Sequence, residues 1–296
     1  MNSIFDIINI PLGYLFKGIY FLVNNYGFTI ILFTLAIKLV LLPLNIKQQK
    51  SMKKMQGLQP RLAKIQEKYA NDKEKQSQET MKLYQEMGVN PMGGCLPMLI
   101  QLPVLFALYN IIRKPMQYIM MLSKEEILKI SEIITGKVGD FATLNQIELA
   151  TKLESSIDKL SGLVNKADII NFNFFGFDLS VTPTFNFISQ NLEYILIPLL
   201  AGGTTYLVSV ISAKMAGNTA ANNDAASSMK TMNAIFPFMT AWFAITLPAG
   251  LGIYWTISNL FQMAQMYLLN NLIKVDTSGL TDDEMHFRER KKKKKK

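Results

Sequence analysis

The chain has almost none of the side chains on which covalent catalysis, metal binding and disulfide bonding depend. Its 296 residues include one cysteine, Cys95, and one histidine, His286, which lies in the polar C-terminal part. One cysteine cannot form an internal disulfide, and no histidine is left in the apolar segments for a proton relay or a metal site. The nucleotide-binding pattern GxxxxGK[ST] is also absent, which argues against a nucleotide-driven motor. We therefore expect no enzyme activity, no cofactor and no metal.

Long hydrophobic runs, by contrast, dominate the sequence. Hydrophobic residues make up 49% of the chain and the mean hydropathy is +0.17, which is more apolar than an ordinary soluble domain. Five runs are each close to the roughly 20 residues that cross a bilayer: residues 27–44, 95–112, 192–212, 232–247 and 250–269. The last two are separated only by Pro248 and Ala249, which predicts a tight connection between two helices.

Residues 1–26 lack the basic start and the unbroken apolar core of a cleaved signal peptide. Apolar side chains recur there at helical spacing, which predicts an amphipathic helix lying in the membrane interface. The residues concerned are Phe5, Ile8, Leu12, Leu15, Ile19 and Leu22. An uncleaved anchor or a further partial span remains the alternative.

Basic residues are concentrated in two segments. Residues 45–94 carry ten lysines and arginines and the tail 271–296 carries nine, whereas the eight in residues 113–191 are offset by acids. The positive-inside rule places the first segment and the tail in the cytoplasm. With five spans, the N-terminus then lies outside, the C-terminus is cytoplasmic, and residues 113–191 are extracytoplasmic.

Residues 46–88 are predicted to form a charged helical hairpin on the cytoplasmic side. Asn71 and Asp72 mark its turn, and Gly88 suits a C-terminal cap. Apolar side chains recur on one face of each helix: Met52, Met55, Leu62, Ile65 and Tyr69 in the first, and Met81, Tyr84 and Met87 in the second. The hairpin is either a solvated spacer or a docking or gating element. The fold class is therefore an all-α polytopic membrane protein, a five-span helical bundle with a cytoplasmic helical hairpin.

The segment 113–191 is long for a loop and is expected to carry structure of its own. Ser123 and Glu126 form a capping-box pattern, and residues 143–164 show a second helical pattern. No catalytic constellation is visible. We expect a helical extracytoplasmic segment between residues 27–112, which hold spans one and two, and residues 192–270, which hold spans three to five.

Lys38 is the residue that the composition explains least, because it lies inside the apolar run 27–44. A cation at that depth costs about 2.5–3.5 kcal/mol on insertion scales, so it marks a polar site by default. The alternative is a lysine that extends its side chain to the headgroups. Amides and hydroxyls in the other runs, namely Gln101, Thr205, Asn259 and Gln262, also need partners. Together they indicate a hydrated cavity within the helices.

Three stretches of sequence carry a resemblance to a known family. They are NPMGGCLPMLIQLPVLFALY at residues 90–109, the segment 236–270 and the segment 39–91. In these stretches the chain resembles the YidC-type membrane protein insertases, the YidC/Oxa/Alb family. The resemblance implies a groove that is open to the cytoplasm and to lipid, marked by a basic residue in the first conserved span. Lys38 stands at that position, where many members have arginine, so the charge is kept but the bidentate fork is lost.

The resemblance implies a membrane protein insertase and chaperone of the bacterial plasma membrane, acting alone or with the Sec translocon. Its partners would be nascent membrane-protein substrates, membrane lipids, and the ribosome through the basic tail and the hairpin. The expected groove contacts are Lys38, Gln101, Thr205, Trp255, Asn259 and Gln262. The tail lysines expected to contact ribosomal RNA or lipid are Lys291, Lys292, Lys293, Lys294, Lys295 and Lys296, unless they serve only as a topology anchor.

The alternative function is a small-solute or anion transporter that uses Lys38 as an intramembrane charge site. Such a protein often contains internal repeats, and we see none in the sequence. It would also leave the charged hairpin at residues 46–88 without a role. The insertase is therefore the favoured prediction.

Overall fold

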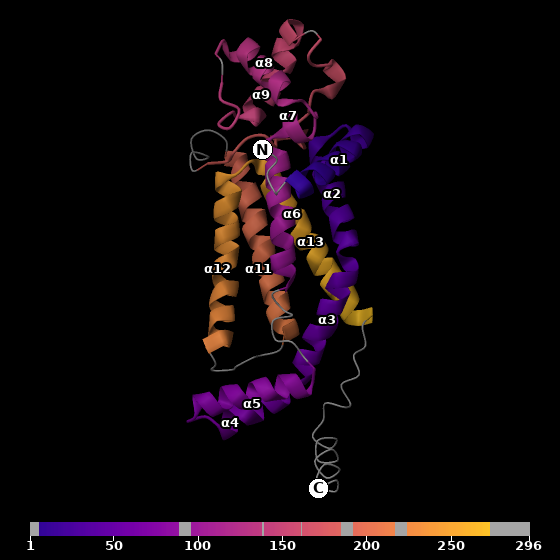
Figure 1. The fold of residues 1–296 in the computed structure, drawn as a ribbon. Coiled ribbons are helices and arrows are strands. Elements are labelled where there is room, and N and C mark those ends of the chain that lie inside the picture. The colour runs from indigo at the N-terminus through magenta and orange to yellow at the C-terminus, as the bar shows by residue number, and fades with distance from the viewer. Residues whose placement is uncertain are drawn as a thin grey trace. The chain divides into compact units, whose positions relative to one another are not determined.

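The computed structural model describes residues 6–88, 96–137, 139–160, 162–184, 192–216 and 224–272 (Figure 1). The chain divides into two compact units, each built from three stretches of sequence. The first unit consists of Met1–Val40, Met98–Thr205 and Pro237–Phe261. The second unit consists of Leu41–Pro97, Tyr206–Phe236 and Gln262–Lys296.

A helix occupies each of the five predicted spans. These helices are α2 (Tyr26–Val40) with α3 (Leu42–Gly57), α6 (Leu96–Arg113), α11 (Leu196–Ala216) preceded by η4 (Leu192–Ile195), α12 (Asp224–Thr246) and α13 (Ala249–Leu272). Within the described residues, two helical stretches have the length and composition to cross a membrane, Asp6–Val23 and Leu192–Met215. A third is added if α2 and α3, interrupted at Leu41, form one broken span. The helical class is confirmed, and the count of five spans remains a prediction.

The interruption between α2 and α3 was not predicted. Pro43 stands in the first turn of α3, where its missing N–H would be unpaired in any case. Its ring restricts the preceding residue and disfavours an unbroken helix. The predicted span 27–44 therefore ends as a regular helix at Val40, two residues after Lys38.

Helix α1 (Asp6–Val23) packs against α2 in the first unit. Its buried face is Asn9, Gly13, Phe16 and Tyr20. The predicted apolar stripe turns the other way, since Ile8, Leu15 and Leu22 are exposed. An outward apolar face suits contact with lipid. Because α1 also passes the length and composition test for a span, the alternative of a further span stays open beside the interfacial helix.

A short helix, α7 (Pro115–Tyr118), ties the start of α1 to the 113–191 segment. The Tyr118 hydroxyl donates to Asp6 Oδ1 at 2.9 Å, and Asn9 Nδ2 donates to Tyr118 Oη at 3.4 Å. Burial raises the pKa of the Tyr118 phenol, so the phenol stays protonated and remains a donor.

Within its described residues, the 113–191 segment carries helices at both places where the sequence predicts them, although the second is in two pieces. The capping box at the start of α8 (Lys124–Thr135) is confirmed: Glu126 N donates to Ser123 Oγ at 3.2 Å and Ser123 N donates to Glu126 Oε2 at 2.7 Å. The predicted helix 143–164 is split into α9 (Gln146–Lys152) and the 3₁₀ helix η2 (Glu154–Leu160). A further 3₁₀ turn, η3, covers Lys166–Asp168.

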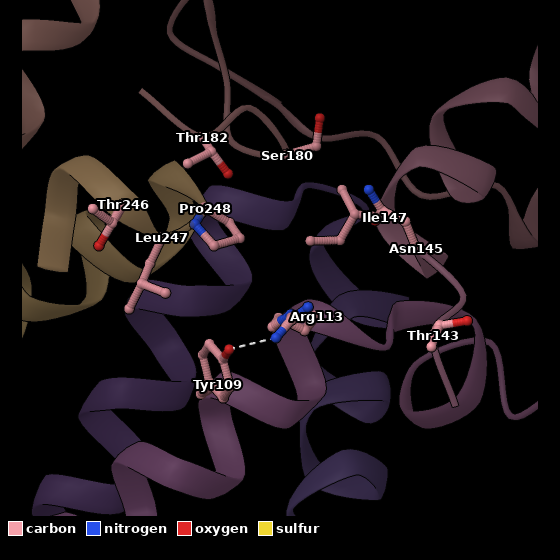
Figure 2. Close-up of a pocket in the computed structure, with 10 residues that line it drawn as sticks. All are labelled: Tyr109, Arg113, Thr143, Asn145, Ile147, Ser180, Thr182, Thr246, Leu247 and Pro248. Atoms are coloured by element: carbon pink, nitrogen blue, oxygen red, sulfur yellow. Dashed lines mark hydrogen bonds between the residues drawn. The ribbon is translucent and has the colours of Figure 1, made fainter. Parts of the chain in front are cut away.

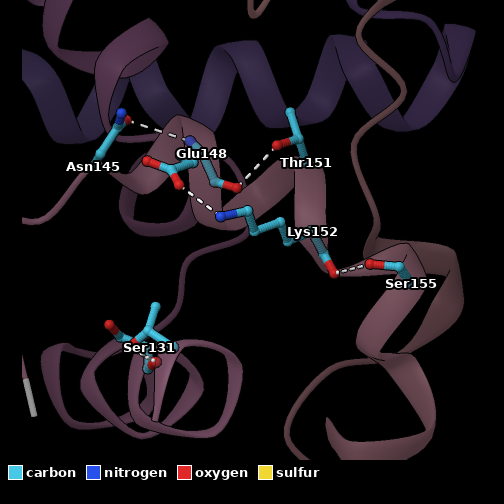
Figure 3. A network of polar contacts seen from close by, with 7 residues as sticks. Ser131, Asn145, Glu148, Thr151, Lys152 and Ser155 are labelled. Carbon is cyan, nitrogen blue, oxygen red and sulfur yellow. Dashed lines mark hydrogen bonds and ion pairs between the residues drawn. The ribbon is translucent and has the colours of Figure 1, made fainter. Parts of the chain in front are cut away.

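Local hydrogen bonds explain why α9 is short (Figure 3). Asn145 caps its start by accepting from Glu148 N, and Glu148 forms an ion pair with Lys152 at 2.6 Å. The Ser155 hydroxyl then donates to the Lys152 carbonyl at 3.0 Å. A serine that binds a nearby backbone carbonyl competes with the helical pattern, and the chain tightens into a 3₁₀ helix.

A two-stranded antiparallel hairpin, β1 (Asn173–Phe174) and β2 (Phe177–Asp178), corrects the all-α prediction in one small place. Both turn residues have positive φ, 49° at Phe175 and 88° at Gly176. Such values are typical of tight hairpin turns, which favour Asn-Gly. The Phe-Gly pair does not carry that signal, so the sequence did not reveal the hairpin.

Residues 179–184 lie across the connection between α12 and α13. Ala249 N donates to the carbonyl of Val181 at 2.8 Å, and Gly250 N donates to that of Leu179 at 3.1 Å. Thr184 N donates to the carbonyl of Ile245 at 2.8 Å. The predicted tight connection at Pro248 is thus confirmed and is held by backbone hydrogen bonds from a distant part of the sequence.

In the second unit, α4 (Gln59–Lys68) and α5 (Lys73–Glu86) run side by side (Figure 1). They correspond to the predicted hairpin 46–88, except that its first helix is divided between α3 and α4 at Leu58. Asp72 caps α5 by accepting from Lys75 N at 2.9 Å, and Gly88 has a φ of 61°. The apolar core is Leu58, Leu62 and Leu83, with Met55, Ile65, Tyr84 and Met87 packed on it. The prediction was wrong for Met81, which is 50% exposed, and it missed Leu83. Spacing alone does not show which of Met81 and Leu83, two positions apart on the same helix, is buried.

Two neighbouring glycines in α11 provide a test of helix packing. A Cβ at Gly202 would lie 2.9 Å from Ala241 Cβ on α12, whereas nothing lies within 4 Å of a Cβ at Gly203. We expect Gly203→Ala to be neutral or stabilising, since alanine is favoured over glycine in helices by roughly 0.5–1 kcal/mol. We expect Gly202→Ala to be less stable than Gly203→Ala by about 1–3 kcal/mol because the core is overpacked. Thermal unfolding of both variants in detergent measures the difference, and equal stabilities would contradict the packing.

The capping box gives a pH prediction for α8. The backbone and hydroxyl hydrogen bonds with Ser123 lower the pKa of Glu126. A carboxylate with a lowered pKa in the folded state stabilises above its unfolded pKa, and that contribution is lost as the pH falls through the lowered value. Hydrogen-exchange protection of the first turn of α8 should therefore drop on acidification below the ordinary glutamate range. Glu126→Gln should remove this dependence and Glu125→Gln should keep it; the reverse pattern would contradict the assignment.

Candidate functional site

Lys38 lies on the buried face of α2. The buried residues of this helix include Thr34 and Ile37, one turn before it and directly beside it. Lys38 itself is 6% exposed, whereas Leu39 and Val40 are 55% and 75% exposed. The side chain therefore faces the protein interior, which favours the interior polar site over a lysine extended along the lipid surface.

The ammonium group of Lys38 has no hydrogen bond or ion pair with any residue that the structure describes. Thr34, one turn earlier, uses its hydroxyl on the carbonyl of Ile30 at 2.7 Å and is not available as a donor to another group. A buried charge without a partner is costly and is retained where water or a ligand completes it. The Lys38 ammonium group therefore keeps its capacity to bind an anion.

Asn259 links two of the apolar helices within the first unit. Its Nδ2 donates from α13 to Thr205 Oγ1 at 2.8 Å and to Thr204 Oγ1 at 3.1 Å on α11. Both threonine hydroxyls also donate to carbonyls of their own helix. The structure therefore brings together two predicted site residues, Thr205 and Asn259, in a satisfied interhelical contact.

Gln101 and Trp255 have other partners. Gln101 Nε2 on α6 donates to the Tyr254 hydroxyl on α13. Trp255 stacks on Phe243 of α12, with ring centroids 6.2 Å apart and planes 20° apart. Both contacts cross between helices of the first unit. Tyr254 is itself 2% exposed.

Gln262 is half-buried and belongs to the second unit. Gln265, three residues further along α13, is 8% exposed and accepts from Asn45 Nδ2 at 3.4 Å. Gln49 is also buried, at 6% exposure. Sequence reasoning missed Asn45 and Gln49, because they stand at the start of a charged segment and look like ordinary solvated residues.

A cavity of about 350 Å³ lies elsewhere in the first unit (Figure 2). It is lined by Tyr109, Arg113, Thr143, Asn145, Ile147, Ser180, Thr182, Thr246, Leu247 and Pro248. The Arg113 guanidinium donates to the Tyr109 hydroxyl at 2.6 Å. None of the predicted groove residues lines this cavity.

The predicted tail contacts Lys291 to Lys296 lie outside the described residues. The described part of the chain holds no cluster of three metal-ligating side chains.

Comparisons with known proteins give several matches over most of the chain. The family model described as 60Kd inner membrane protein matches residues 18–277. The membrane protein insertase YidC of Clostridium perfringens is 36% identical over 83% of this chain and 78% of its own length. That of Fusobacterium nucleatum is 34% identical over 91% and 98%, and the insertase MisCA of Bacillus subtilis is 33% identical over 83% and 70%.

A crystal structure described as an active YidC insertase with its first transmembrane domain resolved is 28% identical, with a TM-score of 0.48. The match covers 90% of this chain and 47% of that one. The class defined by the family match is that of multi-pass membrane proteins. Within it, this chain belongs to the YidC/Oxa family of membrane protein insertases. Membership of this family agrees with the expectation that the chain is not an enzyme.

The contact between Asn259 and Thr205 should be energetically coupled. Interhelical hydrogen bonds in membrane proteins average about 0.6 kcal/mol in double-mutant cycles. We expect a coupling of that order between Asn259→Leu and Thr205→Val, measured by unfolding in detergent. Thr246→Val is the control, since its hydroxyl is exposed and bonds only to its own helix, at Trp242 and Phe243. Its coupling to Asn259→Leu should be near zero, and an equal coupling would count against a specific contact.

Proposed function

We propose that this insertase moves the polar tail of a short membrane protein through a hydrated groove at Lys38. The observation that carries the proposal is a lysine on the buried face of an apolar helix, 6% exposed and without a partner among the described residues. The groove residues would be Lys38, Gln101, Thr205, Trp255, Asn259 and Gln262. Acidic residues of the tail would pair transiently with the ammonium group.

The main barrier to insertion is the desolvation of the tail. Burying a polar group without a hydrogen bond costs about 1–3 kcal/mol in proteins, and a tail has many such groups. Water in a groove shortens the dry part of the path. Two opposite charges 4 Å apart attract by about 4 kcal/mol at an effective dielectric constant of 20. That attraction is large enough to hold a carboxylate and small enough to let it leave.

The remaining polar side chains would form the wall of the groove. Asn259, Thr205 and Gln101 already have protein partners, so they would not bind the tail strongly. Lys38 alone among the predicted contacts in the first unit lacks one within the described residues. Lys38 would therefore attract the acidic tail, and the other polar side chains would keep the groove hydrated.

The membrane arrangement belongs to the same proposal. Five spans put the basic hairpin of α4 and α5 and the tail 271–296 in the cytoplasm of a bacterium, with the N-terminus outside. A basic hairpin and tail on that side suit ribosomal RNA and anionic lipid, both in a salt-dependent way. Insertion alone and insertion together with the Sec translocon are both compatible with the described geometry.

Substitutions at Lys38 test the proposal with two one-span substrates, one with an acidic tail and one with a neutral tail. Lys38→Gln should lower insertion of the acidic substrate by roughly 5- to 30-fold, which corresponds to a loss of 1–2 kcal/mol. Lys38→Glu should lower it further, and Lys38→Arg should preserve it. Insertion of the neutral substrate should change little. Protease protection of the substrate in reconstituted vesicles measures each yield.

Leu39→Gln is the matched control, because it places the same amide one residue on, at an exposed position. It should leave the acidic substrate unaffected. A photocrosslinker at position 38 and another at position 39 extend the test to stalled nascent chains. An equal loss of both substrates in Lys38→Gln, or crosslinks to lipid alone at position 38, would rule out the groove at Lys38.

A further inference from the structure

Phe175 is a large apolar side chain exposed at a turn. It stands at the tip of the β1–β2 hairpin and is 78% exposed. The other phenylalanines of the hairpin region have partners: Phe172 packs edge-on against Tyr26 at 4.8 Å, and Phe177 packs against Tyr194 at 5.6 Å. Insertion through a groove at Lys38 gives Phe175 no role.

The hairpin is fixed firmly to the start of α2. Asn25 Nδ2 donates to the carbonyl of Asn173 at 3.0 Å, and Tyr26 N donates to that of Asn171 at 3.3 Å. The Phe174 ring lies directly on Gly27, where a Cβ would overlap it. The depth of the hairpin tip is therefore set by the first turn of α2.

Three aromatic rings connect that turn to the tip. Phe28 packs against Phe174 at 5.4 Å and against Phe175 at 6.0 Å, and the two hairpin rings are 4.7 Å apart. All three contacts have edge-to-face geometry, which is favourable for aromatic pairs. Phe175 thus belongs to an ordered cluster.

Phe28 is also the first residue of an exposed apolar stripe on α2. Leu32 and Leu39 follow it at spacings of four and seven residues, and the three are 47%, 42% and 55% exposed. These spacings place them on one helix face. In a multi-pass membrane protein an exposed apolar face of this kind contacts lipid. Phe175 extends the face beyond the first turn of the helix.

The backbone at the tip does not favour a phenylalanine. Phe175 has a φ of 49°, a region in which asparagine and glycine are preferred. Polar residues flank the hairpin aromatics in sequence: Asn171 and Asn173 alternate with them, and Asp178 accepts hydrogen bonds from Ser180. An apolar ring set in a polar rim suits the boundary between headgroups and acyl chains.

We propose that Phe175, supported by Phe28 and Phe174, is a lipid anchor that enters the bilayer surface next to the start of α2. The occupant of this face is phospholipid, because the cluster continues the exposed apolar stripe of α2 without a break. The anchor holds the 113–191 segment at a fixed depth relative to the membrane. It goes beyond the insertion function and does not depend on Lys38.

Spin labels at single cysteines test the proposal. In a Cys95→Ser chain, labels are attached at Phe175→Cys, at Leu32→Cys on the exposed stripe, and at Ile133→Cys, which is 39% exposed on α8. The full chain is reconstituted alone in vesicles of phosphatidylethanolamine and phosphatidylglycerol. Collision rates with oxygen, which enters lipid, and with a water-soluble nickel complex give the depth of each label.

The oxygen-to-nickel ratio at position 175 should approach that at position 32 and exceed that at position 133 by several-fold. A ratio at position 175 equal to that at position 133 would overturn the proposal. A low ratio at position 32 would overturn it as well, because the stripe on α2 would then not face lipid. Neither result bears on insertion, which is measured with substrates.

A second measurement keeps an aromatic ring at the tip. In a chain with Trp242→Phe and Trp255→Phe, quenching by brominated lipids is compared between Phe175→Trp and Ile133→Trp. Quenching at position 175 should be several-fold stronger. Equal quenching at both positions, with emission typical of water, would show that the ring does not enter the bilayer.

Discussion

Every polar group that this chain places among its apolar helices needs a partner, and this requirement determines how the helices contact one another. Asn259 on α13 meets Thr204 and Thr205 on α11, and Gln101 on α6 meets Tyr254 on α13. Each contact removes an unpaired donor from an apolar setting, where leaving it unpaired is expensive. Within the described residues Lys38 departs from this rule, as do the Tyr26 hydroxyl and Gln265 Nε2, and Lys38 is the residue through which the function is proposed.

Small residues let neighbouring helices approach closely. Gly202 on α11 faces Ala241 on α12, and Gly250 at the start of α13 lies close to Ile30 and Tyr26 of α2. Without a hydrophobic drive to bring helices together inside lipid, close backbone approach and interhelical hydrogen bonds supply the attraction. The aromatic contacts of Phe16 with Tyr26 and Phe33 act in the same way between α1 and α2.

Much of the fold follows from local sequence signals. The five apolar runs, the capping box at Ser123 and the turn before α5 depend on composition or short spacing, and all are helices or caps in the structure. The β1–β2 hairpin, the break at Leu41 and the burial of Leu83 were not predicted. The hairpin and the burial of Leu83 depend on distant packing or on an untypical residue, such as Phe175 at positive φ. The break follows from Pro43, a local signal that the length of the apolar run obscured. Lys38 stood out because a charge in an apolar run is conspicuous, whereas Asn45 and Gln49 sit among charged neighbours and gave no signal.

The backbone hydrogen bonds of residues 179–184 have a mechanical consequence. They join residues 179–184 to both sides of the connection at Pro248, so separating α12 from α13 there breaks either the bond to Ile245 or the two bonds from Ala249 and Gly250. A movement that parts these two helices must begin at the ends far from Pro248. The distance between the two helices can then increase most at those far ends, while the connection at Pro248 keeps its conformation.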